Sequence, residues 1–192
     1  MAKLYFKYGT MGSSKTAQAL ITKFNYEEKD MKVLFFKPSI DNRDGENIIK
    51  SRVGLSSKAV ELHPTDNIYE VYKSSINYNV IIIDECQFLT EKQVDELVDI
   101  IIDFNIPVLC FGLKTDFTTS LFPGSKRLLE VADSIQEIKS ICKCGRKATV
   151  NARFDNDKIV LKGEQICIGG NDKYVSMCLK CWLKEKSKVS VE

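Results

Sequence analysis

The sequence predicts an α/β fold, with a parallel β-sheet flanked by helices and a small metal-held module after it. Three observations lead to this prediction. Short apolar runs alternate with helical segments over residues 1–139, a phosphate-binding pattern follows the first run, and two close cysteine pairs stand within residues 140–192. A chain of 192 residues, 44% of them apolar, can bury a sizeable core and still carry a small appendage. We therefore expect two domains, residues 1–139 and residues 140–192.

Four short apolar runs are the expected strands of the sheet. Their continuous apolarity is typical of strands that are covered on both faces, as in a parallel sheet. The runs are residues 4–8 (LYFKY), 32–36 (KVLFF), 80–84 (VIIID) and 107–112 (PVLCFG).

Helical periodicity separates these runs. Residues 16–28 are expected to form a first helix, with one apolar face made of Ala17, Leu20, Ile21 and Phe24. In residues 90–104, Thr90 and Gln93 form a capping box. The apolar residues that follow recur at helical spacing, namely Val94, Leu97, Val98, Ile101 and Ile102. Periodicity fades near residue 140, and the polar residues 184–192 predict a frayed tail.

Charge and apolar patterning exclude several classes of protein. The 28 basic and 26 acidic residues nearly balance, so no long-range field favours nucleic acid or an anionic membrane as a partner. Residues 97–113 are the most apolar stretch, but polar residues and a proline interrupt it, so no membrane span is expected. The N-terminus has no signal-peptide pattern, which favours a cytoplasmic protein. Seven cysteines in a reducing compartment predict metal ligands or core residues before disulfides.

The loop between the first strand and the first helix has the pattern of a phosphate-binding loop. Residues 8–17, YGTMGSSKTA, nearly match G-x-x-x-x-G-K-[ST], with Ser14 in place of the second glycine. Backbone N–H groups and the helix dipole of such a loop attract phosphate. Lys15 is expected to reach the β- and γ-phosphates of ATP, and the Thr16 hydroxyl to bind Mg²⁺. The predicted phosphate-binding residues are Gly9, Thr10, Met11, Gly12, Ser13, Ser14, Lys15 and Thr16. Taken alone, the near-match is also compatible with an ordinary glycine-rich turn.

Two acidic residues end the third apolar run, in NVIIIDECQF. Parallel sheets gather their ligands at the carboxyl ends of strands, so these side chains are expected beside the phosphate loop. Asp84 is placed to hold Mg²⁺, and Glu85 to act as a general base. The alternative is that Asp84 only caps the next helix and that Glu85 is solvated.

In combination these residues resemble the thymidine kinases of the human-cytosolic type (type II), which are also common in bacteria. The phosphate loop, DECQF (84–88), GLKTDFTTSLF (112–122) and IGGNDKYVSMC (168–178) with a cysteine after it come in the family's order. The family usually has glycine where this chain has Cys86. The resemblance spans essentially the whole chain. It implies a P-loop NTPase-like, RecA-like core with a zinc-binding lasso domain, which transfers phosphate from ATP to the 5′-hydroxyl of thymidine for nucleotide salvage.

The resemblance also assigns roles by position. It implies that Glu85 is the base that accepts the hydroxyl proton. It implies that Lys15, Thr16 and Asp84 bind the phosphates and Mg²⁺, and that Arg43 lies near the phosphates. The family forms homotetramers. In the family a lasso loop reads the thymine edge through backbone groups. The substrate-binding residues that the resemblance implies are Met11, Asp41, Gln87, Phe88, Leu113, Phe117, Phe122, Asn151, Arg153, Ile166, Ile168, Gly169, Gly170 and Tyr174.

Several of these positions also have a plainer interpretation. Leu113, Phe117 and Phe122 are compatible with ordinary core residues, and an arginine in a polar loop such as Arg43 is usually solvated. Many family members carry threonine where this chain has Asn151, a difference that leaves the preference for thymidine over deoxyuridine open. Two other functions are compatible with the motifs. One is a nucleic-acid-binding protein in which a P-loop ATPase core carries a zinc ribbon, and the other is a kinase-like scaffold inactivated by Ser14.

Two cysteine pairs predict one structural zinc site. Cys178 and Cys181 have the C-x-x-C spacing, whereas Cys142 and Cys144 are one residue closer because Ile141 occupies the usual first-ligand position. We expect Cys142, Cys144, Cys178 and Cys181 to bind Zn²⁺, with Cys167 as the alternative to Cys142. Cys86 and Cys110 are interpreted as core residues, and nothing around His63 indicates catalysis.

Overall fold

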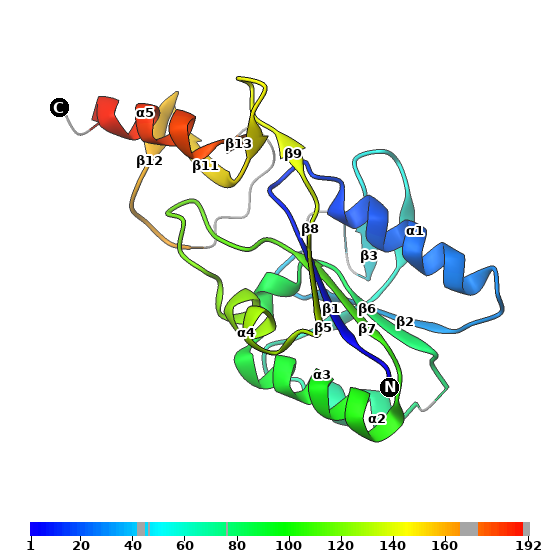
Figure 1. Ribbon diagram of the computed structural model, residues 1–192. Coiled ribbons are helices and arrows are strands. Elements are labelled where there is room, and N and C mark those ends of the chain that lie inside the picture. The colour runs from blue at the N-terminus through cyan, green and yellow to red at the C-terminus, as the bar shows by residue number, and fades with distance from the viewer. Residues whose placement is uncertain (42–44, 46, 76, 166–172, 190–192) are drawn as a thin grey trace.

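A six-stranded parallel sheet forms the centre of the larger part of the molecule (Figure 1). The computed structural model describes residues 1–41, 45, 47–75, 77–165 and 173–189. The strand order is β5-β2-β6-β7-β1-β8. These strands are β1 (Leu4–Tyr8), β2 (Val33–Pro38), β5 (Val60–Leu62), β6 (Val80–Ile83), β7 (Val108–Gly112) and β8 (Ser134–Glu137). The predicted parallel sheet is confirmed, and each of the four predicted runs forms a strand in it.

Helices cover both faces of this sheet (Figure 1). Helix α1 (Lys15–Glu27) packs on one face, where Ala19 and Leu20 join a buried cluster. The opposite face carries three helices, α2 (Ile68–Lys73), α3 (Glu91–Phe104) and α4 (Pro123–Val131). The capping box of Thr90 and Gln93 begins α3 as predicted.

The predicted apolar face of α1 is only partly correct. Ala17 and Leu20 are buried, but Ile21 is 49% and Phe24 is 58% exposed. Ala19, which the sequence analysis did not assign to that face, is fully buried instead. The buried side of the helix is thus rotated away from Ile21 and Phe24, because the sheet contacts the helix along Ala19 and Leu20.

A small module follows the sheet and begins with β9 (Ser140–Ile141). It has a three-stranded antiparallel sheet of order β12-β11-β13, a β9-β10 hairpin and one helix. Its other elements are β10 (Lys147–Ala148), β11 (Val150–Asp155), β12 (Lys158–Val160), β13 (Tyr174–Met177) and α5 (Leu179–Val189). The predicted frayed tail is therefore wrong as far as Val189, because α5 packs Trp182 into the module. In Figure 1 the module lies at the opposite end of the molecule from α2 and α3.

Two further elements border the site. The hairpin of β3 (Ile48–Lys50) and β4 (Ser56–Lys58) stands beside α1, and the short 3-10 helix η1 (Cys86–Phe88) follows β6. None of the helices in the described ranges is both long and apolar enough to cross a membrane.

Candidate active site

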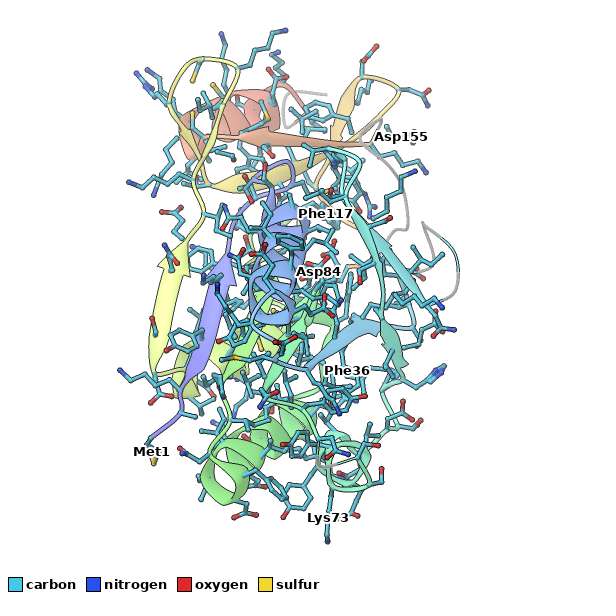
Figure 2. All side chains as sticks on the ribbon, turned by 90° about the vertical axis from the view of Figure 1, so that its right-hand side faces the viewer. Met1, Phe36, Lys73, Asp84, Phe117 and Asp155 are labelled. Carbon is cyan, nitrogen blue, oxygen red and sulfur yellow. The ribbon has the colours of Figure 1, made fainter. Side chains whose placement is uncertain are left out.

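A cavity of about 630 Å³ opens at the carboxyl ends of β1, β6 and β7. Figure 2 shows the labelled Asp84 at the end of the sheet and Phe117 between the sheet and the C-terminal module. Most of the predicted site residues line this one cavity. They are Met11, Gly12, Ser14, Lys15, Thr16, Asp41, Asp84, Glu85, Gln87, Phe88, Leu113, Phe117, Phe122, Asn151 and Tyr174.

Other predicted residues lie behind the cavity wall or outside the described residues. Gly9, Thr10 and Ser13 belong to the phosphate loop but do not line the cavity, and neither does Arg153. Arg43, Ile166, Ile168, Gly169 and Gly170 fall outside the described residues, as does Cys167.

The loop between β1 and α1 requires its glycines. A Cβ on Gly9 would lie 2.4 Å from Ser13 Oγ and 2.5 Å from the Ile138 carbonyl oxygen, so no larger residue fits there. Gly12 has φ +75°, a conformation that side chains rarely adopt. Ser14 also has a left-handed conformation, with φ 64°, although it carries a side chain. The loop is therefore tightly folded, with left-handed backbone at Gly12 and Ser14 and local strain at Ser14.

Lys15 begins α1 and is 7% exposed. Its Nζ donates hydrogen bonds to the Thr10 carbonyl oxygen at 2.8 Å and to Ser13 Oγ at 3.4 Å. Burial lowers the pKa of Lys15, and the nearby carboxylates of Glu85 and Asp84 oppose that shift. A buried cation held over the loop in this way is suited to a polyanion.

Asp84 follows β6 directly and is only 3% exposed. Burial and the adjacent charge of Glu85 raise the pKa of Asp84 to about 7, against a hydrogen bond from Thr16 that lowers it. Among the described residues, Asp84 Oδ1 has no hydrogen-bond partner although it is buried. An unsatisfied carboxylate oxygen next to a threonine hydroxyl fits the oxygen ligands that Mg²⁺ prefers.

Glu85 has an unusual backbone conformation, with φ 50°. Such left-handed residues cost on the order of 1 kcal/mol or more and concentrate at functional sites. Gln87 orients the carboxylate, because its Nε2 donates to Glu85 Oε2 at 2.6 Å while its Oε1 accepts from the Leu113 N–H at 2.9 Å. The carboxylate of Glu85 is therefore fixed at the cavity wall by a buried side chain.

Aromatic side chains form the other half of the cavity. Phe88 and Phe122 meet edge to face with ring centroids 5.8 Å apart, and Phe117 is 1% exposed. The guanidinium of Arg153 lies 4.1 Å from the centre of the Phe117 ring, and its Nη1 donates to the Glu164 carbonyl oxygen at 3.0 Å. Arg153 thus supports Phe117 from behind instead of facing the cavity.

Met11 connects the phosphate loop to the C-terminal module. Its N–H donates to Asn151 Oδ1 at 2.7 Å, and its carbonyl oxygen accepts a hydrogen bond from Ser176 Oγ. Asn151 and Ser176 are cross-strand partners in β11 and β13. Asn151 Nδ2 also donates to the Thr115 carbonyl oxygen at 3.3 Å. The side chain of Asn151, expected near the base, therefore already bonds to two segments of the core.

The sequence analysis missed several residues of the site. Arg52, Ser51 and Val53 from the β3–β4 hairpin line the cavity, as do Asp116 and Gln165. Gln165 Nε2 donates to Asp116 Oδ2 at 2.9 Å, joining the residue before the predicted lasso to the core. Asp116 stood inside the quoted GLKTDFTTSLF segment, whereas no local pattern marks Arg52 or Gln165.

The four predicted cysteines converge, with their Sγ atoms within 4.8 Å of one another. Cys144 Sγ lies 3.6 Å from both Cys142 Sγ and Cys178 Sγ. Ligands about 2.3 Å from a tetrahedral Zn²⁺ are about 3.8 Å apart, so the spacing fits that ion. Backbone N–H groups of Cys144 and Cys178 lower the pKa of Cys142 to about 6, which favours a thiolate.

Comparison with known proteins gives a consistent result. A family model described as "Thymidine kinase" matches residues 2–182. The chain is similar to proteins of that name from Legionella pneumophila strain Lens (48% identity, 93% of this chain and 88% of the relative), Zymomonas mobilis (44%, 96% and 98%) and Agrobacterium fabrum (46%, 96% and 97%).

Proposed function

The chain belongs to the thymidine kinase family, and we propose that its cavity transfers the γ-phosphoryl group of ATP to the 5′-hydroxyl of thymidine. The products are dTMP and ADP, as nucleotide salvage for DNA synthesis requires. The single observation that carries this proposal is the acidic pair Asp84 and Glu85 facing the same cavity as Lys15 of the phosphate loop. The alternative of a nucleic-acid-binding ATPase is not favoured, because the relatives that cover nearly the whole chain are thymidine kinases.

The loop of residues 9–16 is the proposed phosphate-binding element. Its backbone N–H groups and the start of α1 face the polyphosphate, and Lys15 Nζ supplies the positive charge. Family position adds Arg43 as a further cation for the charge that develops during transfer. Thr16 and Asp84 would hold Mg²⁺, which when bound neutralises the phosphates.

Glu85 is the proposed general base. Its carboxylate takes the proton of the 5′-hydroxyl as that oxygen bonds to the γ-phosphorus, while the bond from the phosphorus to the oxygen of ADP breaks. Gln87 keeps the carboxylate in place through the 2.6 Å hydrogen bond. Proton transfer to a positioned base contributes about 10²- to 10⁴-fold to rate.

The nucleoside is proposed to occupy the aromatic half of the cavity. Apolar and aromatic walls with a few polar groups are typical of such pockets. We assign this role to Met11, Asp41, Gln87, Phe88, Leu113, Phe117, Phe122, Asn151 and Tyr174, all of which line the cavity. Arg153 is proposed to act from behind Phe117, and Ile166, Ile168, Gly169 and Gly170 keep the lasso role that the family implies.

Structural zinc, subunit assembly and location complete the proposal. The four cysteines would hold Zn²⁺ in a closed site with no open position for chemistry. A homotetramer is the family's arrangement, and the exposed Ile21 and Phe24 on α1 offer apolar surface that a subunit interface would cover. A cytoplasmic location follows from the same family.

The direct test is release of ADP from purified protein with ATP and Mg²⁺. Thymidine, deoxyuridine, deoxycytidine and no nucleoside are compared in parallel. Thymidine-stimulated turnover supports the proposal, and the deoxyuridine rate measures the effect of Asn151. Glu85→Gln should lower kcat by about 10²- to 10⁴-fold in a folded protein. Hydrolysis that ignores the nucleoside, or full activity in Glu85→Gln, would refute the assigned reaction or the assigned base.

A further inference from the structure

The turn between β3 and β4 is fixed by Ser51, a polar residue that is only 5% exposed. The Ser51 N–H donates to the Leu55 carbonyl oxygen at 2.8 Å, and the Leu55 N–H donates to Ser51 Oγ at 3.1 Å. The Gly54 N–H donates to the Ser51 carbonyl oxygen at 3.0 Å, with Gly54 at φ +90°. These bonds close a tight turn, so the residue next to Ser51 is presented in a defined direction.

That residue is Arg52, which lines the cavity beside the phosphate loop. Its Nη1 lies 3.7 Å from the position that a Cβ on Gly12 would take. Apart from Gly12 and its two chain neighbours, no other heavy atom of the described residues lies within 4 Å of that position. Arg52 is exposed, and no carboxylate in the described part of the chain forms an ion pair with it. An arginine thus approaches the phosphate loop without an anionic partner among the described residues.

Arg52 and Lys15 place two positive charges around one space. Arg52 lowers the pKa of Lys15, adding to the larger effect of burial. Two like charges that converge on a cavity repel each other until an anion lies between them.

We propose that Arg52 binds phosphate oxygens of the nucleoside triphosphate, reaching them from the β3–β4 hairpin while Lys15 reaches them from the start of α1. This role rests on the proposed kinase function and adds a residue outside the phosphate loop and the acidic pair. Arginine suits it because its planar guanidinium donates two parallel hydrogen bonds to a phosphate, whereas lysine acts as a point charge. The β3–β4 hairpin is then the second wall of the phosphate site.

The test compares three variants with the wild-type protein. Arg52→Gln removes the charge, Arg52→Lys keeps the charge without the fork, and Lys58→Gln removes a charge from β4 of the same hairpin, outside the cavity. Three quantities are measured, namely KM for ATP and KM for thymidine in steady-state turnover, and the Kd of inorganic tripolyphosphate from its shift of Tm. Without ligand, the Tm of all four proteins should agree, because Arg52 forms no ion pair with a carboxylate in the ranges that the structure describes.

Arg52→Gln should raise KM for ATP and the Kd of tripolyphosphate by about 10- to 100-fold, the usual loss for a hydrogen bond to a charged group. KM for thymidine should stay at its wild-type value. Arg52→Lys should recover part of the loss, and Lys58→Gln should match the wild type. Wild-type affinities in Arg52→Gln, or an equal loss in Lys58→Gln, would overturn the inference.

The tripolyphosphate measurement separates this inference from the proposed function. One outcome is that the wild-type protein does not phosphorylate thymidine, while Arg52→Gln binds tripolyphosphate more weakly than the wild type. In that case the kinase proposal fails and the phosphate site stands. If thymidine is phosphorylated and Arg52→Gln behaves as the wild type, only the role of Arg52 fails. Should Arg52→Gln be less stable, Arg52→Met, which keeps the apolar stem, carries the same comparison.

Discussion

The core and the C-terminal module keep their structure by different means. In the core, apolar side chains on both faces of the parallel sheet form two large buried clusters. In the module, the apolar cluster consists of four buried residues, Val150, Ala152, Ile159 and Trp182. Beside it the cysteines form a second small cluster. A core of that size gives little stability, so we predict that the module depends on a bound metal in a way that the sheet does not.

The candidate site nevertheless needs both regions. The phosphate loop and the acidic pair belong to the core, while Asn151 and Tyr174 come from the module. Met11 joins the two, because Asn151 and Ser176 bond to its N–H and its carbonyl oxygen. In the proposed site, a stable region would thus bind the phosphates and hold the proposed base, and a less stable region would complete the nucleoside pocket.

Removal of the metal should separate the two regions most strongly. Trp182 is the only tryptophan of the chain and lies in the module, so its fluorescence reports the module alone. Treatment with a zinc chelator, or Cys178→Ala, should expose Trp182 and abolish thymidine turnover, while far-UV circular dichroism keeps the signal of the α/β core. Cys110→Ala, in a buried strand outside the cluster, should lose some stability but retain the metal and the Trp182 signal. Joint loss of both signals would show that the regions fold as one unit.

The acidic pair should make the core less stable than its packing alone allows. The pKa of Asp84 is about 7 in the folded protein against an ordinary value of 3.8, so the folded state holds this proton more tightly. Well below pH 3.8, the carboxyl of Asp84 therefore does not lower the unfolding free energy of the protein. As the pH rises to about 7, the unfolding free energy falls by an amount that reaches on the order of 4 kcal/mol.

Asp84→Asn should accordingly be inactive but more stable than the wild-type protein. The gain in unfolding free energy should increase from pH 5 to pH 8, measured by urea unfolding in buffer without Mg²⁺. Asp99→Asn, an exposed carboxylate on α3, serves as the control and should show no such trend. A gain that is the same at both pH values would contradict the raised pKa.

The contact at Met11 should transmit a smaller effect from the module to the phosphate loop. Ser176→Ala removes the hydroxyl that bonds to the Met11 carbonyl oxygen and should cost about 1 kcal/mol at that contact, or roughly a fivefold rise in KM for ATP. The control is Ser187→Ala, whose hydroxyl bonds only to Lys184 of its own helix. Equal kinetics in the two variants would mean that the module does not position the loop.

The difference between the core and the module also determined which elements could be predicted from the sequence. The strands of the core were predictable because a parallel sheet buried on both faces gives continuous apolar runs, as in β6. The short strands β3 to β5 and the edge strand β8 have too few apolar residues for that signal. Helix α5 was missed because four of its 11 residues are lysines, which hide the apolar side that carries Trp182.

Residues of the candidate site could likewise be predicted only where a local sequence pattern marks them. The phosphate loop, Asp84 and Glu85 stand in contiguous motifs, so their spacing alone indicates the chemistry. Ser176 reaches Met11 across 165 positions, and Gln165 reaches Asp116 across 49, which no local pattern encodes. Arg52 depends in the same way on how the β3–β4 hairpin is placed over the loop.

The smallest predicted effect concerns Ser14, which departs from the phosphate-loop pattern. Ser14 has φ 64° and makes no side-chain hydrogen bond to the start of α1, so its side chain adds strain without a capping bond. Ser14→Gly would relieve about 1 kcal/mol of strain, and the greater freedom of glycine in the unfolded chain would offset much of it. We expect a gain in unfolding free energy of about 0.5 kcal/mol or less and an unchanged KM for ATP. Thr119→Gly, an exposed residue with φ 74° outside the cavity, is the matched control for relief of strain. A large change in KM for ATP in Ser14→Gly alone would show that the Ser14 hydroxyl takes part in phosphate binding.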